Sequence, residues 1–286
     1  MNLKERVQSG VDGKFEGLSI GFPRLSDYIF GLQKSCYMLL GGLSGCFKST
    51  ITDFILLNAI QDAEAKGVEL NIHYYSFEID ELTKKCNWLS NVIFNKYNRV
   101  ISPETIKGYG KNKLTKEEQA LVNSEIDYVD SLFKRINFIY RSTNPTGIYK
   151  HLMDYASTKG TFEYYEYSNE ENVVCKGIKG YKQNNPLAYN LVVMDHIFLL
   201  KKERGFGAKE VIDKMSEFFV VLRNLCGYSF IVLQQFNQGL NSIERQKFKN
   251  VDISPSQGDF RDSTVSYTDA HIVIRLMKPI SMDMSS

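Results

Sequence analysis

The sequence predicts an α/β protein with a mostly parallel central sheet and helices on both faces. Apolar runs of strand length alternate with segments of helix length, and several runs are apolar throughout. A glycine-rich turn joins the first of these runs to a helix. Parallel strands need long crossover connections, which the intervening helices supply. The 286 residues, 43% of them hydrophobic, can form one full core.

The elements follow one another in a regular order. Strands are expected at 36–41, 69–77, 136–141, 191–194, 228–234 and 270–276, and helices at 49–64, 81–97, 115–134, 208–226 and after Asn144-Pro145. The helix at 81–97 carries one apolar stripe, made of Leu82, Cys86, Leu89 and Ile93. We expect residues 1–19 to be an N-terminal arm or linker and residues 20–286 to form the domain.

Residues 161–188 differ in character from the rest of the chain. Thr161 to Tyr167 alternate like an exposed strand, and Val173 to Ile178 have the pattern of a returning strand. The polar residues Asn169 to Asn172 between them favour a turn. The segment is therefore predicted to be a β-hairpin insertion on the surface.

Composition excludes several classes of protein. The five cysteines are widely spaced without a C-x-x-C pair, which indicates reduced thiols in a cytoplasmic protein. No apolar run is long enough for a signal peptide or a membrane span, so we expect no membrane partner. The four histidines lack metal-ligand spacing, so a zinc site is not expected. The net charge of +2 neither indicates nor excludes a nucleic-acid partner.

A glycine-rich loop follows the strand at 36–41. It consists of Gly42, Leu43, Ser44, Gly45, Cys46, Phe47, Lys48, Ser49 and Thr50. In a phosphate-binding loop the backbone N–H groups and the helix N-terminus hold phosphates, the lysine reaches the outer phosphates, and the serine hydroxyl binds Mg²⁺. Phe47 stands where that pattern has its second glycine, so its ring must point away from the phosphates. An ordinary glycine-rich turn remains the alternative.

Three polar residues follow other apolar runs, at the edge where ligands bind in open parallel sheets. Asp195 ends the run at 191–194 and can hold the water shell of Mg²⁺. Glu78 can polarise the water that attacks a γ-phosphate, and Gln235 can sense that phosphate. The alternatives are ordinary polar residues at strand ends and helix starts.

Taken in order, these segments resemble the RecA-like motor domain of DnaB-like replicative helicases, especially the phage members. The resemblance extends from Ile20 to about Lys278. Besides the glycine-rich loop it rests on six segments: Ile20 to Leu25, Ser76-Phe77-Glu78, Met194 to Leu200, Gln235-Phe236-Asn237, Gly258 to Ser263 and Asp269-Ala270-His271.

The resemblance implies an ATPase with ATP and Mg²⁺ as cofactors, in which Glu78 is the catalytic base and Gln235 the sensor. Lys48 would bind the phosphates, and Ser49 and Asp195 would hold the metal. It also implies a homo-hexameric ring around single-stranded DNA, with replication partners, in the cytoplasm of a bacterium or phage-infected cell. Two channel loops would bind the DNA through Lys201, Lys202, Arg204 and Lys209, and through Arg245, Lys247 and Lys249. Otherwise both loops are ordinary solvated charge runs.

The sequence departs from the family at three points. Phe47 replaces a glycine, and Gly42 and Gly45 would have to supply the flexibility of the loop. No N-terminal helical domain precedes Ile20, which puts ring assembly and primase recruitment in doubt. The chain ends at Ser286, before the basic finger of the family, so we expect a C-terminus truncated relative to it. Arg275 and Lys278 are poor substitutes by position.

The favoured function is an ATP-dependent helicase motor that couples hydrolysis to translocation on single-stranded DNA. The alternative is a non-unwinding RecA-like ATP-binding protein, such as a recombination mediator or an accessory ATPase, which the missing finger and N-terminal domain favour. A small-molecule phosphotransferase would need an arginine-rich lid near the loop. The insertion at 161–188 carries tyrosines and glutamates instead.

Overall fold

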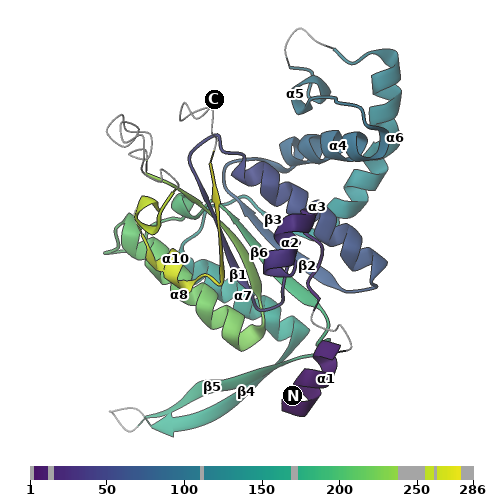
Figure 1. The fold of residues 1–286 in the computed structure, drawn as a ribbon. Coiled ribbons are helices and arrows are strands. Elements are labelled where there is room, and N and C mark those ends of the chain that lie inside the picture. The colour runs from purple at the N-terminus through teal and green to yellow at the C-terminus, as the bar shows by residue number, and fades with distance from the viewer. Residues whose placement is uncertain are drawn as a thin grey trace, which may run out of the picture.

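A parallel sheet with helices on both faces forms the centre of the protein (Figure 1). The computed structural model describes residues 3–11, 16–109, 113–168, 173–237, 255–260 and 263–277. Within them the sheet has the strand order β3-β2-β6-β7-β1-β8, and each pair of neighbours is parallel. Its strands are β1 (Tyr37–Gly42), β2 (Leu70–Ser76), β3 (Ile136–Ile139), β6 (Tyr189–Asp195), β7 (Ser229–Gln235) and β8 (Ile272–Leu276). The predicted fold class is confirmed.

The helices lie mostly between successive strands, as crossover connections. They are α1 (Leu3–Val11), α2 (Pro23–Ile29), α3 (Lys48–Ala65), α4 (Glu81–Tyr97), α5 (Pro103–Ile106), α6 (Lys116–Phe133), α7 (Pro145–Lys159), α8 (Ala208–Cys226) and α10 (Val265–Asp269), with short 3₁₀ turns η1 (Ile197–Leu199) and η3 (Gln257–Asp259). Local sequence fixes several starts. Asp80 caps α4 by accepting from the Thr83 N–H, and Asn144 caps α7 directly before its proline.

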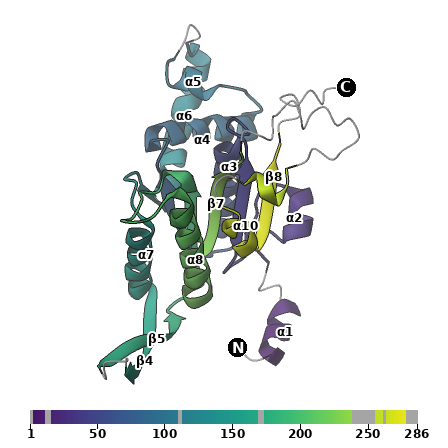
Figure 2. The same ribbon diagram turned by 90° about the vertical axis from the view of Figure 1, so that its left-hand side faces the viewer.

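Alternation along the strands divides the core into two layers. In β1, Met38 and Leu40 pack on the side of α3, α4 and α6, whereas Tyr37 and Leu39 pack on the side of α7 and α8 (Figure 2). Every residue of β1, β6 and the first six of β7 is buried. Strands covered on both faces are apolar along their length, which explains the uninterrupted hydrophobic runs of the sequence.

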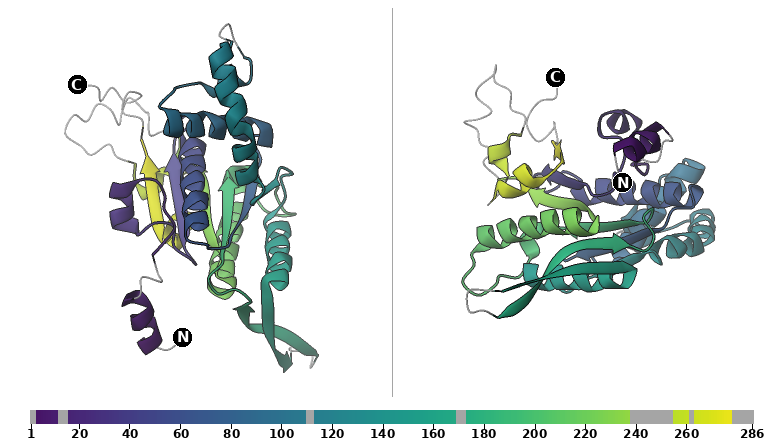
Figure 3. Two further views of the ribbon diagram at one scale, coloured as in Figure 1. Left: turned by 90° about the vertical axis from the view of Figure 1, so that its right-hand side faces the viewer. Right: turned by 90° about the horizontal axis from the view of Figure 1, so that it is seen from below.

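A two-stranded hairpin extends from the body, as predicted (Figures 1 and 3). It consists of β4 (Gly160–Ser168) and β5 (Val174–Gln183), which pair antiparallel. Tyr181 anchors the base by donating from its hydroxyl to the Ala156 carbonyl at 2.9 Å. Helix α7 runs back from the carboxyl ends of the strands, so the hairpin leaves the sheet at the opposite end. The turn predicted at 169–172 lies outside the described residues.

Two details differ from the sequence-based expectations. The N-terminal arm contains a helix, α1, and the packed body already includes Leu18, which is 1% exposed and bridges to Leu32. The apolar stripe of α4 is wrong at Leu82, which is 71% exposed. Because α4 packs against both α3 and α6, its buried face is broader and rotated: it contains Lys84, Cys86, Trp88, Leu89, Val92 and Ile93.

Among the residues described, the model contains no helix with both the length and the apolar character needed to cross a membrane.

The central strand β7 should dominate stability. Ile231 is fully buried there, so Ile231→Ala should lower the free energy of unfolding by about 2–5 kcal/mol, through lost burial and a residual cavity. Val221 on α8 is 43% exposed, and Val221→Ala should change it by no more than about 0.5 kcal/mol. Urea denaturation measures both. Equal losses in the two variants would contradict the assignment of the core.

Candidate nucleotide-binding site

The carboxyl ends of β1, β2, β6 and β7 meet at one cavity of about 270 Å³. Its lining comes from all four strand ends: Ser44, Gly45, Phe47, Lys48, Ser49, Thr50, Glu78, Ile79, Asp195, His196 and Gln235. Two larger cavities, of about 680 and 650 Å³, contain none of the residues predicted for the site. The parallel sheet therefore brings together groups that are far apart in the sequence.

The glycine-rich loop curls between β1 and α3. Lys48 is 8% exposed, and its ammonium donates to the carbonyl oxygens of Gly42 and Leu43, both at 2.9 Å. Burial lowers the pKa of Lys48. The side chains of Leu43 and Cys46 are buried in the core, so these residues offer only backbone groups to the cavity. The loop thus has the arrangement that phosphate binding requires.

Phe47 occupies the position of the missing glycine with a glycine-like backbone. Its φ of 58° and ψ of 25° are left-handed, a conformation that costs a residue with a β-carbon about 1–2 kcal/mol. The side chain is 61% exposed. The backbone path of the loop is thereby kept, at the expense of local strain.

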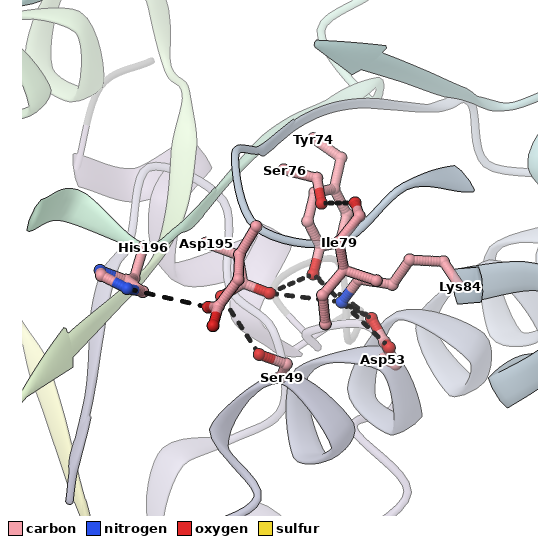
Figure 4. A network of polar contacts seen from close by, with 9 residues as sticks. Ser49, Asp53, Tyr74, Ser76, Ile79, Lys84, Asp195 and His196 are labelled. Atoms are coloured by element: carbon pink, nitrogen blue, oxygen red, sulfur yellow. Dashed lines mark hydrogen bonds and ion pairs between the residues drawn. The ribbon is translucent and has the colours of Figure 1, made fainter. Parts of the chain in front are cut away.

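Ser49 and Asp195 face each other across the floor of the cavity. The Ser49 hydroxyl donates to Asp195 Oδ1 at 3.1 Å, and Asp195 is 2% exposed (Figure 4). A hydroxyl and a carboxylate oxygen beside a phosphate loop are the hard ligands that Mg²⁺ prefers. No group of three or more His, Cys, Asp or Glu residues that could hold a metal occurs within the described ranges. The pair fits a magnesium ion that keeps most of its water and phosphate ligands.

Glu78 lies on the bend that follows β2. Its side chain is 58% exposed, and Oε2 lies 3.8 Å from Nε2 of His196, the residue after Asp195. The Ser76 hydroxyl donates to the Ile79 carbonyl and so closes the bend beneath Glu78 (Figure 4). The carboxylate is therefore accessible and adjacent to the Ser49–Asp195 pair. His196 was not foreseen as part of the site.

Gln235 ends β7 and lines the cavity, while the preceding glutamine points into the protein. Gln234 is fully buried, donates to the Ser263 carbonyl at 3.0 Å and accepts from the Ser266 hydroxyl. Strand alternation separates the two side chains in this way. Of the Gln-Gln pair, the second residue is thus the one that can contact a ligand.

A buried polar network lies directly behind Asp195 (Figure 4). The Lys84 ammonium donates to Asp53 Oδ1 at 3.1 Å, to the Tyr74 hydroxyl at 2.6 Å and to Asp195 Oδ2 at 3.3 Å. Tyr74 also donates to Asp195 Oδ2 at 3.1 Å. Burial raises the pKa of Asp53 to about 6, although the charge of Lys84 opposes this shift. Sequence reasoning missed Asp53, Tyr74 and Lys84.

The first predicted DNA loop lies between η1 and α8, beyond the end of β6. Its predicted contacts Lys201, Lys202, Arg204 and Lys209 are all exposed. Glu203 fixes the middle of the loop by accepting from the Thr146 N–H at 2.9 Å and pairing with Lys214. The four cations therefore project from a braced backbone.

The second predicted DNA loop, with Arg245, Lys247 and Lys249, lies outside the described residues. On either side of it, Phe236 and Phe260 form an antiparallel bridge, with ring centroids 4.9 Å apart. A β-carbon at Gly41 of β1 would come within 2.7 Å of both rings. Arg275, the poor substitute for a basic finger, donates to the Pro255 carbonyl and does not line the cavity.

The left-handed backbone at Phe47 can be tested directly. Phe47→Gly should raise the free energy of unfolding by about 1 kcal/mol, because glycine adopts positive φ without a steric penalty. Phe47→Ala keeps the β-carbon and should change it by no more than about 0.5 kcal/mol. Urea denaturation distinguishes the two. If alanine stabilises as much as glycine, the ring and not the backbone is the source of strain.

Comparison with known proteins rests on structure. No family model matches the chain, and no curated protein matches its sequence. The chain is similar to the solved structure of a helicase ATPase domain, with a TM-score of 0.67 and 17% identity over 99% of this chain and 84% of that one.

A second solved structure is "The Structure Of A DnaB-Like Replicative Helicase And Its Interactions With Primase". Here the TM-score is 0.67 and the identity 15%, over 100% of this chain. The chain spans 59% of the length of that helicase. At this level of identity the likeness concerns the fold. The protein therefore has the RecA-like α/β fold of helicase ATPase domains, including that of a DnaB-like replicative helicase.

Proposed function

We propose that this chain is an ATP-dependent motor of the DnaB-like helicase type, which couples ATP hydrolysis to movement along single-stranded DNA. One observation carries the proposal: a single cavity brings together the glycine-rich loop, the Ser49–Asp195 pair, Glu78 and Gln235. These are the groups that bind phosphates, hold a metal, activate water and detect the terminal phosphate. The fold shared with helicase ATPase domains supports the same function.

In this proposal each residue has one task. The backbone of the loop from Gly42 to Thr50 and the ammonium of Lys48 bind the phosphates of ATP. Ser49 binds Mg²⁺ directly and Asp195 binds it through water. The bound ion neutralises charge on the phosphates. Glu78 accepts a proton from the attacking water, and Gln235 senses the γ-phosphate.

Single-stranded DNA is the proposed partner of the two basic loops. Lys201, Lys202, Arg204 and Lys209 are exposed beyond the same sheet edge that carries the cavity, where a change at the nucleotide can reach them. Cationic side chains bind phosphates without reading sequence, as a translocating motor requires. Assembly of copies into a hexameric ring, and contacts with replication partners, belong to the same proposal.

The alternative is a RecA-like protein that binds ATP and DNA without unwinding. It is favoured by the lining of the cavity, which contains no arginine among the described residues. An arginine at the γ-phosphate commonly contributes a factor of about 10³–10⁵ to hydrolysis. The chain alone would then hydrolyse ATP slowly unless another copy or protein supplies that cation. A strand-displacement assay separates the two functions, because only the motor releases the complementary strand.

The site assignment predicts a distinct pattern in single-strand-stimulated ATPase assays. Glu78→Gln should bind ATP but lower kcat by about 10²–10⁴-fold, because it removes the proton acceptor. Lys48→Ala should abolish ATP binding, because it removes the cation that contacts the phosphates. Equilibrium binding of labelled ATP checks both variants. Equal ATPase activity in the wild type and both variants would refute the proposed site.

The proposed DNA loop predicts a change in salt dependence. The double variant Lys201→Ala/Lys202→Ala should reduce the slope of log affinity against log salt by about 1.4, or about 0.7 for each lost phosphate contact on a single strand. Fluorescence anisotropy with labelled single-stranded DNA measures this slope. Lys134→Ala is the control, because Lys134 is exposed shortly before β3, at the opposite end of the strands. An unchanged slope in the double variant would remove this loop from the DNA interface.

A further inference from the structure

Lys84 is a lysine with no access to solvent. It lies on α4, is 0% exposed, and sits between Asp53 of α3 and Asp195 of β6, both 2% exposed. Its ammonium has three hydrogens, and the acceptors around it are two carboxylates and the Tyr74 hydroxyl. A buried ammonium is tolerated only when such partners replace the lost water.

The network holds each oxygen of Asp195 in a different environment. Oδ2 is fixed from behind by Lys84 at 3.3 Å and by the Tyr74 hydroxyl at 3.1 Å. Oδ1 points forward and accepts from the Ser49 hydroxyl at 3.1 Å, at the floor of the cavity. The carboxylate is thereby locked in one orientation, with one oxygen available to the site.

Lys84 also joins two elements that must keep a fixed separation. Asp53 lies one turn after Ser49 on α3, so both side chains occupy the same face of that helix. By bridging Asp53 and Asp195, Lys84 ties the helix that carries Ser49 to the strand that carries Asp195. A purely structural ion pair would need only one of the two carboxylates.

The charges of the cluster lead to the same conclusion. Lys84 supplies one positive charge against the two negative charges of ionised Asp53 and Asp195, which leaves one negative charge beside Ser49. Without Lys84 the two carboxylates would repel each other, and Asp195 could turn away from the cavity. With Lys84 the remaining charge is directed toward the place where a cation would bind.

We propose that Lys84 is a positioning residue for the divalent cation of the nucleotide site, because it orients Asp195 toward Ser49 from behind. This inference rests on the proposed nucleotide and magnesium site and adds to it a residue outside the cavity lining. It concerns metal affinity. The contacts of the loop backbone and Lys48 with phosphate should be independent of it.

The test compares nucleotide binding with and without magnesium. A fluorescent, slowly hydrolysed ATP analogue is titrated in EDTA, and Mg²⁺ is then titrated at a fixed concentration of the analogue. Lys84→Met alone leaves two buried carboxylates unbalanced and can fail to fold. The double variant Lys84→Met/Asp53→Asn removes one charge of each sign, so it keeps the net charge of the cluster and buries no additional unpaired ion.

In the folded double variant, the Mg²⁺ concentration for half-maximal enhancement of binding should rise about 10–100-fold, the usual effect of removing a group that orients a metal ligand. Affinity in EDTA should stay within about twofold of the wild type. Lys85→Met is the matched control: the neighbouring lysine of α4 pairs with Glu81 and Asp130 at the surface, and its loss should leave the Mg²⁺ titration unchanged.

The outcomes separate the two proposals. A wild-type Mg²⁺ titration in the folded double variant would overturn the role of Lys84 and leave the proposed function intact. Equal weakening in EDTA and in Mg²⁺ would also overturn it, because that pattern indicates general damage to the site. If the wild type binds the analogue without any effect of Mg²⁺, the proposed metal site fails, and the role of Lys84 fails with it.

Discussion

The central constraint on this protein is a parallel sheet that is buried on both faces. Along β1, β6 and most of β7 no side chain reaches solvent, so polar groups are confined to the strand ends or need buried partners. All strands of the sheet end at one edge, and the polar residues that follow them gather there. The candidate site is thus a consequence of how the core excludes water.

The network around Lys84 is the exception that this constraint allows. Three ionisable side chains lie within the core because each satisfies the others, and the last residue of β6 connects them to the cavity. An ionic cluster of this kind adds little net stability, since desolvation offsets the attraction. Its geometry, however, is far more restricted than that of apolar packing, which makes it suited to holding a ligand oxygen in place.

The sequence predicted what depends on local order along the chain. Uninterrupted apolar runs identified the strands, and the loop ending in Lys48 and Ser49 identified the site, because both signals lie within short segments. Lys84 could not be found this way, since its partners come from α3 and β6. One weak signal existed: Lys84 stands four residues before Trp88, on the apolar face of α4. Leu82 was misplaced because a stripe does not specify which neighbours a helix contacts.

The hairpin of β4 and β5 has a consequence for how the protein behaves among other chains. Within the described residues these strands pair only with each other, so each leaves one row of backbone groups open to a further strand. Exposed charges interrupt both rows, with glutamates at 163 and 166 and lysines at 176, 179 and 182. A strand added at either edge would have to desolvate these charges, so the hairpin is protected against indiscriminate β-sheet aggregation despite its exposed tyrosines.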